Sequence, residues 1–350
     1  MTFHSIKSLL GVSALLLSLA ACGNGEDEVQ ETGQNAAALT EVSFATDWKA
    51  QAEHGGFYQA LALGLYEERG LNVTIRPGGP GVNIPQLLAA GAIDYGMGSN
   101  SFIPLNLVKA GAPVKAVMAS FQKDPQVLMT HPRDDIKSLG DMKGHPIMVS
   151  DATLSAFWIW LRATYGFSDT QIRKYTFNLA PFLVDEDAIQ QGYVTSEPYS
   201  ISTQGGVEPQ VFLLSDYGYP GYATFVMTSH ANIEGNPEEV RAFVEASIEG
   251  WYSYLYGDPA PGNALIKQDN PEISDAHIAQ AIAKMREYGI ADSGDSLALG
   301  IGAMTDERWE RFFKVMSENG VYESDLDYKA AYTLEFINKG HGLSMKDGSE

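Results

Sequence analysis

Strand-like and helix-like segments alternate along this chain, and their order limits the fold more than any other feature. Residues 41–46 alternate in polarity as a strand does, and residues 54–69 carry apolar side chains at helical spacing. A second strand (71–75) and a helix (84–90) with Asn83 as its cap repeat the pattern. Such alternation predicts an α/β fold with a mainly parallel sheet and helices on both faces.

The pattern restarts in the middle of the chain, which predicts a second α/β lobe. Strands are expected at 126–130 and 146–150, with a helix at 154–165 after the second of them. A further helix is expected at 185–190, followed by a strand at 193–196.

The order of these segments divides the chain into two lobes. We expect residues 41–126 to form the first part of lobe 1, residues 127–222 to form lobe 2, and residues 223–350 to form the second part of lobe 1 with C-terminal helices. Two crossover strands, near 121–130 and 214–228, would join the lobes.

The N-terminus has the features of a signal peptide. A short basic segment precedes the apolar run 9–19, which is too short to span a bilayer comfortably. Cys22 is the only cysteine in 350 residues and follows two alanines, so residues 1–21 are predicted to be a lipoprotein signal peptide and Cys22 the lipidated residue. The alternative is a plain secretory peptide with an incidental cysteine. Residues 22–40 hold few large apolar side chains and are predicted to be a flexible tether.

Composition excludes several classes of function. With 44 acidic and 23 basic residues, the formal charge of −21 makes nucleic acid and anionic lipid headgroups poor partners. A single cysteine leaves no disulfide and no cluster of thiolate ligands. The glycine-rich run 78–83 does not match a Walker A motif, and no zinc-protease or hydrolase-elbow motif occurs in the sequence. We therefore expect no metal, no cofactor and no enzymatic activity.

The loop 47–58 follows the first predicted strand, where open α/β sheets bind ligands. Trp48 offers a flat face for stacking, and Asp47 offers acceptors for an amino group. His54 and Tyr58 are further candidates for ligand contact. The alternative places Trp48 in the core near the hinge and makes His54 a helix cap.

Two other loops carry polar side chains at the ends of predicted strands. Ser99 and Asn100 precede a helix whose free N–H groups would face a bound acceptor, although a structural turn would look the same. Tyr193 and Glu197 lie at the corresponding place in the second lobe, where Glu197 could instead cap a helix or pair with a lysine. The candidates on the crossover segments are Phe121, Gln122 and Tyr222.

These loops, together with Leu-Gly-Asp-Met-Lys-Gly at 139–144, resemble the periplasmic solute-binding proteins of ABC importers. The group is related to thiamine-pyrimidine synthases, and its members handle nitrate, alkanesulfonates, taurine and thiamine-precursor pyrimidines. The resemblance is strongest from Trp48 to Ser101, with His-Gly-Gly-Phe-Tyr at 54–58 and Leu-Leu-Ala-Ala-Gly at 87–91. It implies the two-lobed type II periplasmic-binding-protein fold, which closes around one ligand.

The resemblance also implies roles for the candidate residues. Asp47 and Trp48 would contact a heterocycle, Ser99 and Asn100 would hydrogen-bond it, and the residues at 193 and 197 would close on it from the other lobe. The candidate loops hold Lys49 as their only cation, whereas a sulfonate or nitrate site should concentrate cations. An aminopyrimidine thiamine precursor is therefore the first prediction, followed by riboflavin and then by alkanesulfonate or nitrate.

The implied partners are a small molecule, an ABC permease, and the membrane through the lipid on Cys22. An exported location, on the periplasmic or cell-surface side, follows from the signal peptide. A sensor that signals to a membrane receptor is an open alternative to an importer component. A pyrimidine-synthase-like enzyme is disfavoured, because those enzymes carry a cysteine-rich iron-binding motif and this chain has one cysteine.

Overall fold

The computed structural model of the protein describes residues 38–347. The predicted signal peptide, the lipidated Cys22 and nearly all of the predicted tether lie outside these residues. Within them, no helix is long and apolar enough to cross a bilayer.

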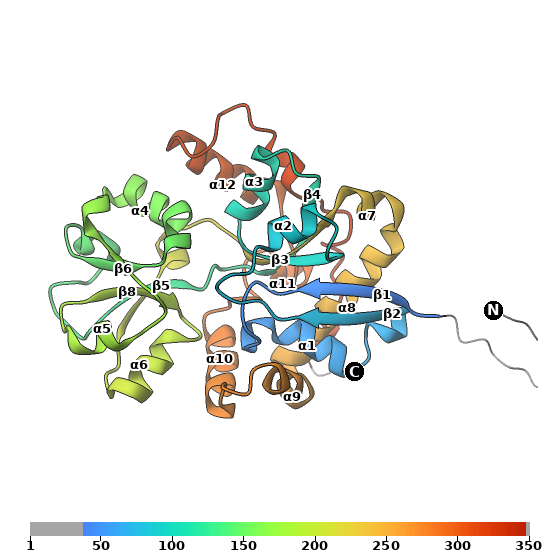
Figure 1. The fold of residues 1–350 in the computed structure, drawn as a ribbon, viewed down its shortest axis with the longest axis horizontal. Helices are drawn as coiled ribbons and strands as arrows, with labels where there is room; N and C mark the ends of the chain where they lie inside the picture. The colour runs from blue at the N-terminus through green and yellow to red at the C-terminus, as the bar shows by residue number, and fades with distance from the viewer. Residues whose placement is uncertain (1–37, 348–350) are drawn as a thin grey trace, which may run out of the picture. The chain divides into compact units, whose positions relative to one another are not determined.

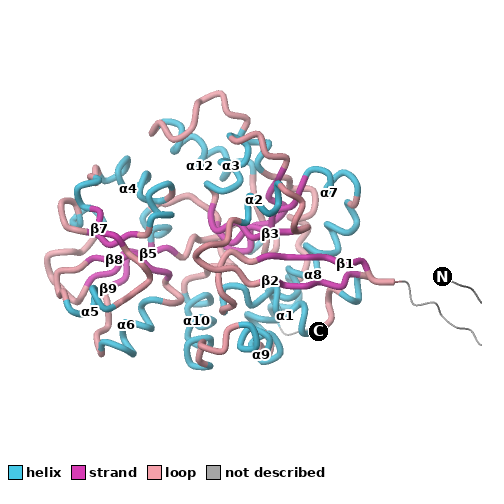
Figure 2. Tube along the Cα trace, viewed as in Figure 1, coloured by secondary structure: helices cyan, strands magenta, loops and turns pink. Residues whose placement is uncertain are grey.

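Two five-stranded sheets organise the described residues (Figures 1 and 2). The strands are β1 (Thr40–Ala45), β2 (Leu71–Arg76), β3 (Tyr95–Asn100), β4 (Val114–Phe121), β5 (Gln126–Thr130), β6 (Ile147–Val149), β7 (Ile172–Lys174), β8 (Ile189–Tyr193), β9 (Gln210–Leu213) and β10 (Ala223–Ser229). The helices of the first half are α1 (Gly55–Ala62), α2 (Ile84–Ala89), α3 (Phe102–Lys109), α4 (Phe157–Tyr165), α5 (Ala180–Val184) and α6 (Glu197–Gly205). Those of the second half are α7 (His230–Gly235), α8 (Pro237–Tyr256), α9 (Ala260–Asp269), α10 (Asp275–Glu287), α11 (Ser296–Leu299) and α12 (Asp306–Glu318).

The two sheets share one topology. Their strand orders are β2-β1-β3-β10-β4 and β7-β6-β8-β5-β9, and only the fourth strand runs antiparallel to its neighbours. In each sheet this fourth strand is the one that arrives from the other sheet. We call the part of the chain around the first sheet lobe 1 (38–121 and 223–347) and the part around the second sheet lobe 2 (126–213). The segments 122–125 and 214–222 are the two crossovers.

Helices cover both faces of the second sheet, with α4 on one face and α5 and α6 on the other (Figure 1). The strands are strongly apolar where they are covered on both sides; β4, for example, is buried along nearly its whole length. The prediction of a mainly parallel α/β architecture with helices flanking two sheets is confirmed.

Close packing of α1 on α8 fixes the loop that precedes α1. A Cβ atom on Gly56 would lie 2.2 Å from the ring of Trp251, and one on Gly250 would lie 2.2 Å from the carbonyl oxygen of Gly56. Only glycine lets the two helices approach so closely. The glycines of the His-Gly-Gly-Phe-Tyr stretch therefore serve packing within lobe 1.

Three predicted elements differ from the structure. The helix expected at 54–69 ends at Ala62, and the chain then turns at Gly64, whose φ is 72°. The helix expected at 185–190 and the strand expected at 193–196 are wrong. Ile189–Tyr193 form β8 instead, because they pair with β5 in an antiparallel ladder, and Glu197 begins α6.

Candidate functional site

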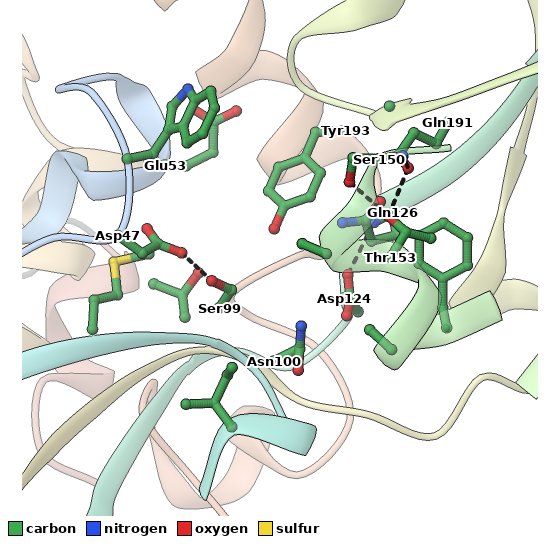
Figure 3. Close-up of a pocket in the computed structure, with 18 of the residues that line it drawn as sticks. Asp47, Glu53, Ser99, Asn100, Asp124, Gln126, Ser150, Thr153, Gln191 and Tyr193 are labelled. Carbon is green, nitrogen blue, oxygen red and sulfur yellow. Dashed lines mark hydrogen bonds between the residues drawn. The ribbon is translucent and has the colours of Figure 1, made fainter. Parts of the chain in front are cut away.

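A cavity of about 360 Å³ is lined by residues of both lobes and of both crossovers. Its volume lies at the lower end of the range of about 300 to 1,000 Å³ that is typical of sites for small molecules. The lining residues gather just beyond the carboxyl ends of β1, β3, β6 and β8, where open α/β sheets bind ligands. Figure 3 shows Asp47 and Ser99 on one side, Ser150 and Gln191 on the other, and Tyr193 between them.

The lobe 1 side centres on the Asp47 carboxylate. Its Oδ2 accepts a short hydrogen bond from the Ser99 hydroxyl, and its Oδ1 lies 3.4 Å from Nε2 of the buried His54. Asn100 stands next to Ser99, and its Oδ1 accepts from the N–H of Phe102 at 3.1 Å, so the amide nitrogen is left to donate into the cavity.

Trp48 forms the aromatic face of this side. Its carbonyl oxygen accepts from the Thr46 hydroxyl at 2.9 Å and from the N–H of Gly78 at 3.0 Å. A Cβ atom on Gly78 would lie 2.2 Å from the carbonyl oxygen of Thr46, so this position requires glycine. The glycine-rich run 78–83 thus braces the loop that carries Trp48.

The lobe 2 side centres on Tyr193 and Glu197. Both oxygens of Glu197 are held, one by the N–H of Tyr193 at 2.8 Å and one by the Tyr175 hydroxyl at 3.4 Å. Burial raises the pKa of Glu197 to about 6. Burial also raises the pKa of Tyr193 well above its ordinary value, and the carboxylates of Asp124 and Asp47 add to the effect. The phenol therefore stays protonated and can donate.

At the cavity, two contacts between described residues join the lobes directly. The buried Glu53 of lobe 1 accepts a short hydrogen bond from the buried hydroxyl of Thr195 in lobe 2. The rings of Trp48 and Phe177 lie 4.9 Å apart between centroids. Phe177 has a φ of 61°, which is strained for a residue with a large side chain, and it is 50% exposed.

The far end of the cavity is polar. Oε1 of Gln191 accepts from the N–H of Ser150 and from the Thr153 hydroxyl, each at 2.6 Å, which fixes the orientation of its amide. Asp124, on the first crossover, lies near this end and is 1% exposed. Its Oδ1 accepts from the N–H of Gln126 at 3.1 Å, and burial raises its pKa to about 7.

The lining is acidic and contains no lysine or arginine among the described residues. Four of its residues are carboxylates, and none of the lining residues, all within 38–347, is a lysine or an arginine. Lys49 pairs instead with Glu272 at 3.1 Å on the surface. The described part of the chain also holds no group of three or more His, Cys, Asp or Glu side chains that could bind a metal ion.

The structure brings seven of the predicted residues together around this one cavity: Asp47, Trp48, His54, Ser99, Asn100, Tyr193 and Glu197. The other four, Tyr58, Phe121, Gln122 and Tyr222, do not line it. Tyr58 donates to Asp269 at 2.7 Å on the far side of α1, and Phe121 packs on Trp251 with ring centroids 5.4 Å apart.

Gln122 and Tyr222 lie on the crossovers but face lobe 1. The side chain of Gln122 donates to the carbonyl oxygen of Ala303 at 2.8 Å. The Tyr222 hydroxyl accepts from the N–H of Thr305 at 3.0 Å, and the guanidinium of Arg308 lies 3.9 Å from the centroid of its ring. These side chains anchor the crossovers to the C-terminal part of the chain.

Several lining residues were not predicted. Ser150 directly follows the end of β6, and Asp124 lies shortly after the end of β4, so a search for polar residues beyond strand ends could also have selected them. Glu53 lies within the predicted loop 47–58 but was not singled out. Phe177 carries no sequence signal, because its place depends on a backbone conformation that is rare for its residue type.

Comparison with known proteins gives a family and a fold. Residues 51–261, more than half of the chain, match the NMT1/THI5-like family. The chain is 25% identical over 310 residues to the riboflavin-binding protein RibY of Chloroflexus aurantiacus, covering 86% of this chain and 87% of the relative. It is 29% identical over 266 residues to the formylaminopyrimidine-binding protein of Halalkalibacterium halodurans, covering 73% of this chain and 77% of the relative.

Among solved structures, the periplasmic aliphatic sulphonate binding protein SsuA of Escherichia coli superposes with a TM-score of 0.64 at 16% identity. The match covers 84% of this chain and 92% of SsuA. The fold is thus that of the two-lobed periplasmic binding proteins. The chain belongs to the NMT1/THI5-like family, and the predicted family and fold are confirmed.

Proposed function

We propose that this protein captures a small planar nitrogen heterocycle that carries an amino group, and delivers it unchanged to an ABC importer. The observation that carries the proposal is the cavity between the lobes, which has the face of Trp48 on one side and four carboxylates but no lysine or arginine in its lining. Stacking on Trp48 would hold a flat ring, and carboxylates would accept its N–H groups.

An aminopyrimidine thiamine precursor is the first candidate ligand. Its ring is small enough to lie against Trp48, and its amino group needs the acceptors that Asp47 and the other carboxylates supply. One relative is named for binding a formylaminopyrimidine, which supports this chemical class.

Riboflavin is the second candidate, and the polar end of the cavity favours it. Because Oε1 of Gln191 is held by Ser150 and Thr153, its amide nitrogen is left to donate, and the hydroxyls beside it suit a hydroxylated chain. RibY, which is named for binding riboflavin, matches over most of both chains.

Small anions fit the cavity poorly. A sulfonate or nitrate would be desolvated among Asp47, Glu53, Asp124 and Glu197 with no arginine or lysine to balance its charge. The likeness to SsuA, at 16% identity, concerns the fold alone.

An enzymatic role is disfavoured. His54 matches the region from which a pyrimidine synthase would consume a histidine, but in this structure its Nε2 is turned toward Asp47 at 3.4 Å. The relatives are named as binding proteins, and the single cysteine leaves no iron-binding motif.

The lipid on Cys22 and export from the cytoplasm are parts of the same proposal. An anchor followed by a polar tether would hold the binding domain near a permease and leave it free to turn. Detergent partitioning of the full-length protein tests this point. Wild type should enter the detergent phase and Cys22→Ala should not; equal partitioning of the two would contradict the anchor.

Mass spectrometry of small molecules released from gently purified protein tests the proposed ligand. We expect an aminopyrimidine or a flavin with an unaltered mass. Added ligand should also be recovered unchanged after incubation. Release of a sulfonate, or appearance of a reaction product, would contradict the proposal.

A further inference from the structure

We infer that Asp124 selects the ligand, by requiring that the ligand bring a hydrogen-bond donor to a carboxylate on the crossover itself. This inference rests on the proposed function, in which the cavity holds a planar heterocycle. It adds the residue that distinguishes an amino-bearing ring from an otherwise similar ring that carries an acceptor.

The hydrogen bonds of the four lining carboxylates separate their roles. Asp47 faces Ser99 and His54 with its two oxygens, and both oxygens of Glu197 are held by protein donors. One oxygen of Glu53 accepts from Thr195 and so joins the two lobes, and no group among residues 38–347 donates to the other oxygen. Each of these three carboxylates therefore already makes a contact that stabilises one side of the cavity or joins the lobes.

Asp124 differs from Asp47 and Glu197 because one of its oxygens has no partner in the described part of the chain, and it differs from Glu53 because its bonded oxygen makes only a local backbone contact. One of its oxygens accepts from the N–H of Gln126 at 3.1 Å, and no group among residues 38–347 donates to the other. The side chain is 1% exposed and lines the cavity, on the opposite side from Asp47 and Ser99 (Figure 3). Burying a carboxylate with one hydrogen bond is costly, and the raised pKa of Asp124 reflects that cost.

No cation of the protein compensates this carboxylate. Lys123, next to it in sequence, pairs with Asp216 at 2.9 Å, and Arg308 donates to the backbone carbonyl oxygens of Gln122 and Gly221. A donor from the ligand would complete the hydrogen bonding of Asp124.

The place of Asp124 gives this contact a second consequence. The residue lies in the crossover 122–125, between β4 of lobe 1 and β5 of lobe 2. A ligand bonded to Asp124 is therefore tied to a segment that must change conformation when the lobes move apart, rather than to one wall alone.

The N–H of Gln126 needs an acceptor at position 124 in any variant. A substitution there can therefore reverse which ligand the protein prefers. In Asp124→Asn, the single amide oxygen is needed for that N–H, so the amide NH₂ would face the ligand where the carboxylate oxygen had been. Two donors would then meet when an amino-bearing ligand binds, whereas a ligand with an acceptor at that point would gain a hydrogen bond.

Calorimetric titration with two probes at about pH 8, where Asp124 with its pKa of about 7 is mostly ionised and can only accept, tests the inference. The first probe is an aminopyrimidine that carries a hydroxymethyl group, and the second is its analogue in which a carbonyl replaces the amino group. Wild type should prefer the amino compound. Asp124→Asn should bind it about tenfold to a hundredfold more weakly and should now favour the carbonyl analogue. Asp325→Asn makes the same chemical change at an exposed position of lobe 1, outside the cavity lining, and should behave as wild type.

Thermal unfolding separates a lost contact from a lost fold. Asp124→Asn removes a buried charge and should unfold at the same temperature as wild type or at a higher one. An unchanged preference in this variant would overturn the inference and leave the proposed function intact. If wild type binds neither of the two probes and does not bind riboflavin, the proposed function is overturned and the inference with it.

Discussion

The two aromatic residues that meet across the cavity, Trp48 and Phe177, are held in different ways. The backbone at Trp48 accepts two hydrogen bonds, and Gly78 packs against its loop so closely that no side chain fits there. Phe177 stands on a strained backbone and is half exposed. We infer that the lobe 1 side is a fixed platform and that the lobe 2 side is a cover that adapts to what lies on the platform.

Removing the platform should have the largest effect. Trp48→Ala is expected to weaken a planar ligand by about 1 to 3 kcal/mol, by analogy with the stacking of bases on aromatic side chains. Trp48→Phe keeps a smaller face and should recover part of the loss. Isothermal titration of both variants measures the difference, and full affinity in Trp48→Ala would show that the ring does not stack there.

The next largest effect, of about 1 to 2 kcal/mol, is on the free energy of unfolding and comes from the titration of Glu197 in lobe 2. Burial raises the pKa of Glu197 from 4.5 to about 6, so the folded state holds this proton where the unfolded state has lost it. Its contribution to stability is present below pH 4.5 and is lost as the pH rises through about 6.

Urea unfolding at pH 4.5 and at pH 6.5 tests this assignment. The free energy of unfolding should change with pH differently in wild type and in Glu197→Gln, which lacks the titrating group and should be relatively more stable at the higher pH. Asp124, whose pKa is about 7, contributes in the same direction in both proteins. Parallel pH profiles would contradict the assignment.

A smaller loss, of about 1 kcal/mol of binding free energy, is expected when the contact between the sides is removed. Thr195→Val keeps the shape of the side chain but leaves the buried Glu53 without its donor, which destabilises the closed arrangement. Thr203→Val, on α6, removes a hydroxyl that bonds only within lobe 2 and is the matched control. Stopped-flow fluorescence should locate the loss in a faster dissociation rate; equal rates in the two variants would argue against Glu53–Thr195 as a closing contact.

The smallest expected effect is on the stability of the protein and comes from the strained residue Phe177 of lobe 2. Phe177→Gly and Phe177→Ala both remove the ring, but only glycine relieves the backbone at φ 61°. The glycine variant should be as stable as the alanine variant or more stable by up to about 1 kcal/mol, because the relief is partly offset by the greater freedom of glycine in the unfolded chain. Denaturant midpoints measure this, and a markedly less stable glycine variant would show that the conformation is not strained.

The sequence predicted the fold better than the site, for physical reasons. Strand and helix periodicity is local, so both sheets could be predicted; the failure at 185–190 arose because pairing of β8 with β5 overrides local preference. The expectation that polar residues at strand ends gather at one site selected Asp47 and Ser99, which line the cavity; Tyr193 also lines it, although the strand on which its selection rested is wrong.

What sequence could not reveal depends on distant partners. Tyr58 follows the same glycines as the site loop, yet it turns to Asp269, which is 211 residues away. Phe177 reaches the cavity through one unusual backbone angle. Asp124 lies shortly after the end of β4, so a search for polar residues beyond strand ends could have found it. That no group among residues 38–347 donates to its second oxygen is visible only in the folded structure.

The central claim is that an acidic cavity with a Trp48 face selects an amino-bearing planar ring over an anion. The most direct measurement is a pair of calorimetric titrations of the wild-type protein at neutral pH, one with an aminopyrimidine thiamine precursor and one with ethanesulfonate. We predict binding of the aminopyrimidine to one site and no measurable binding of ethanesulfonate. Tighter binding of the sulfonate would contradict the account.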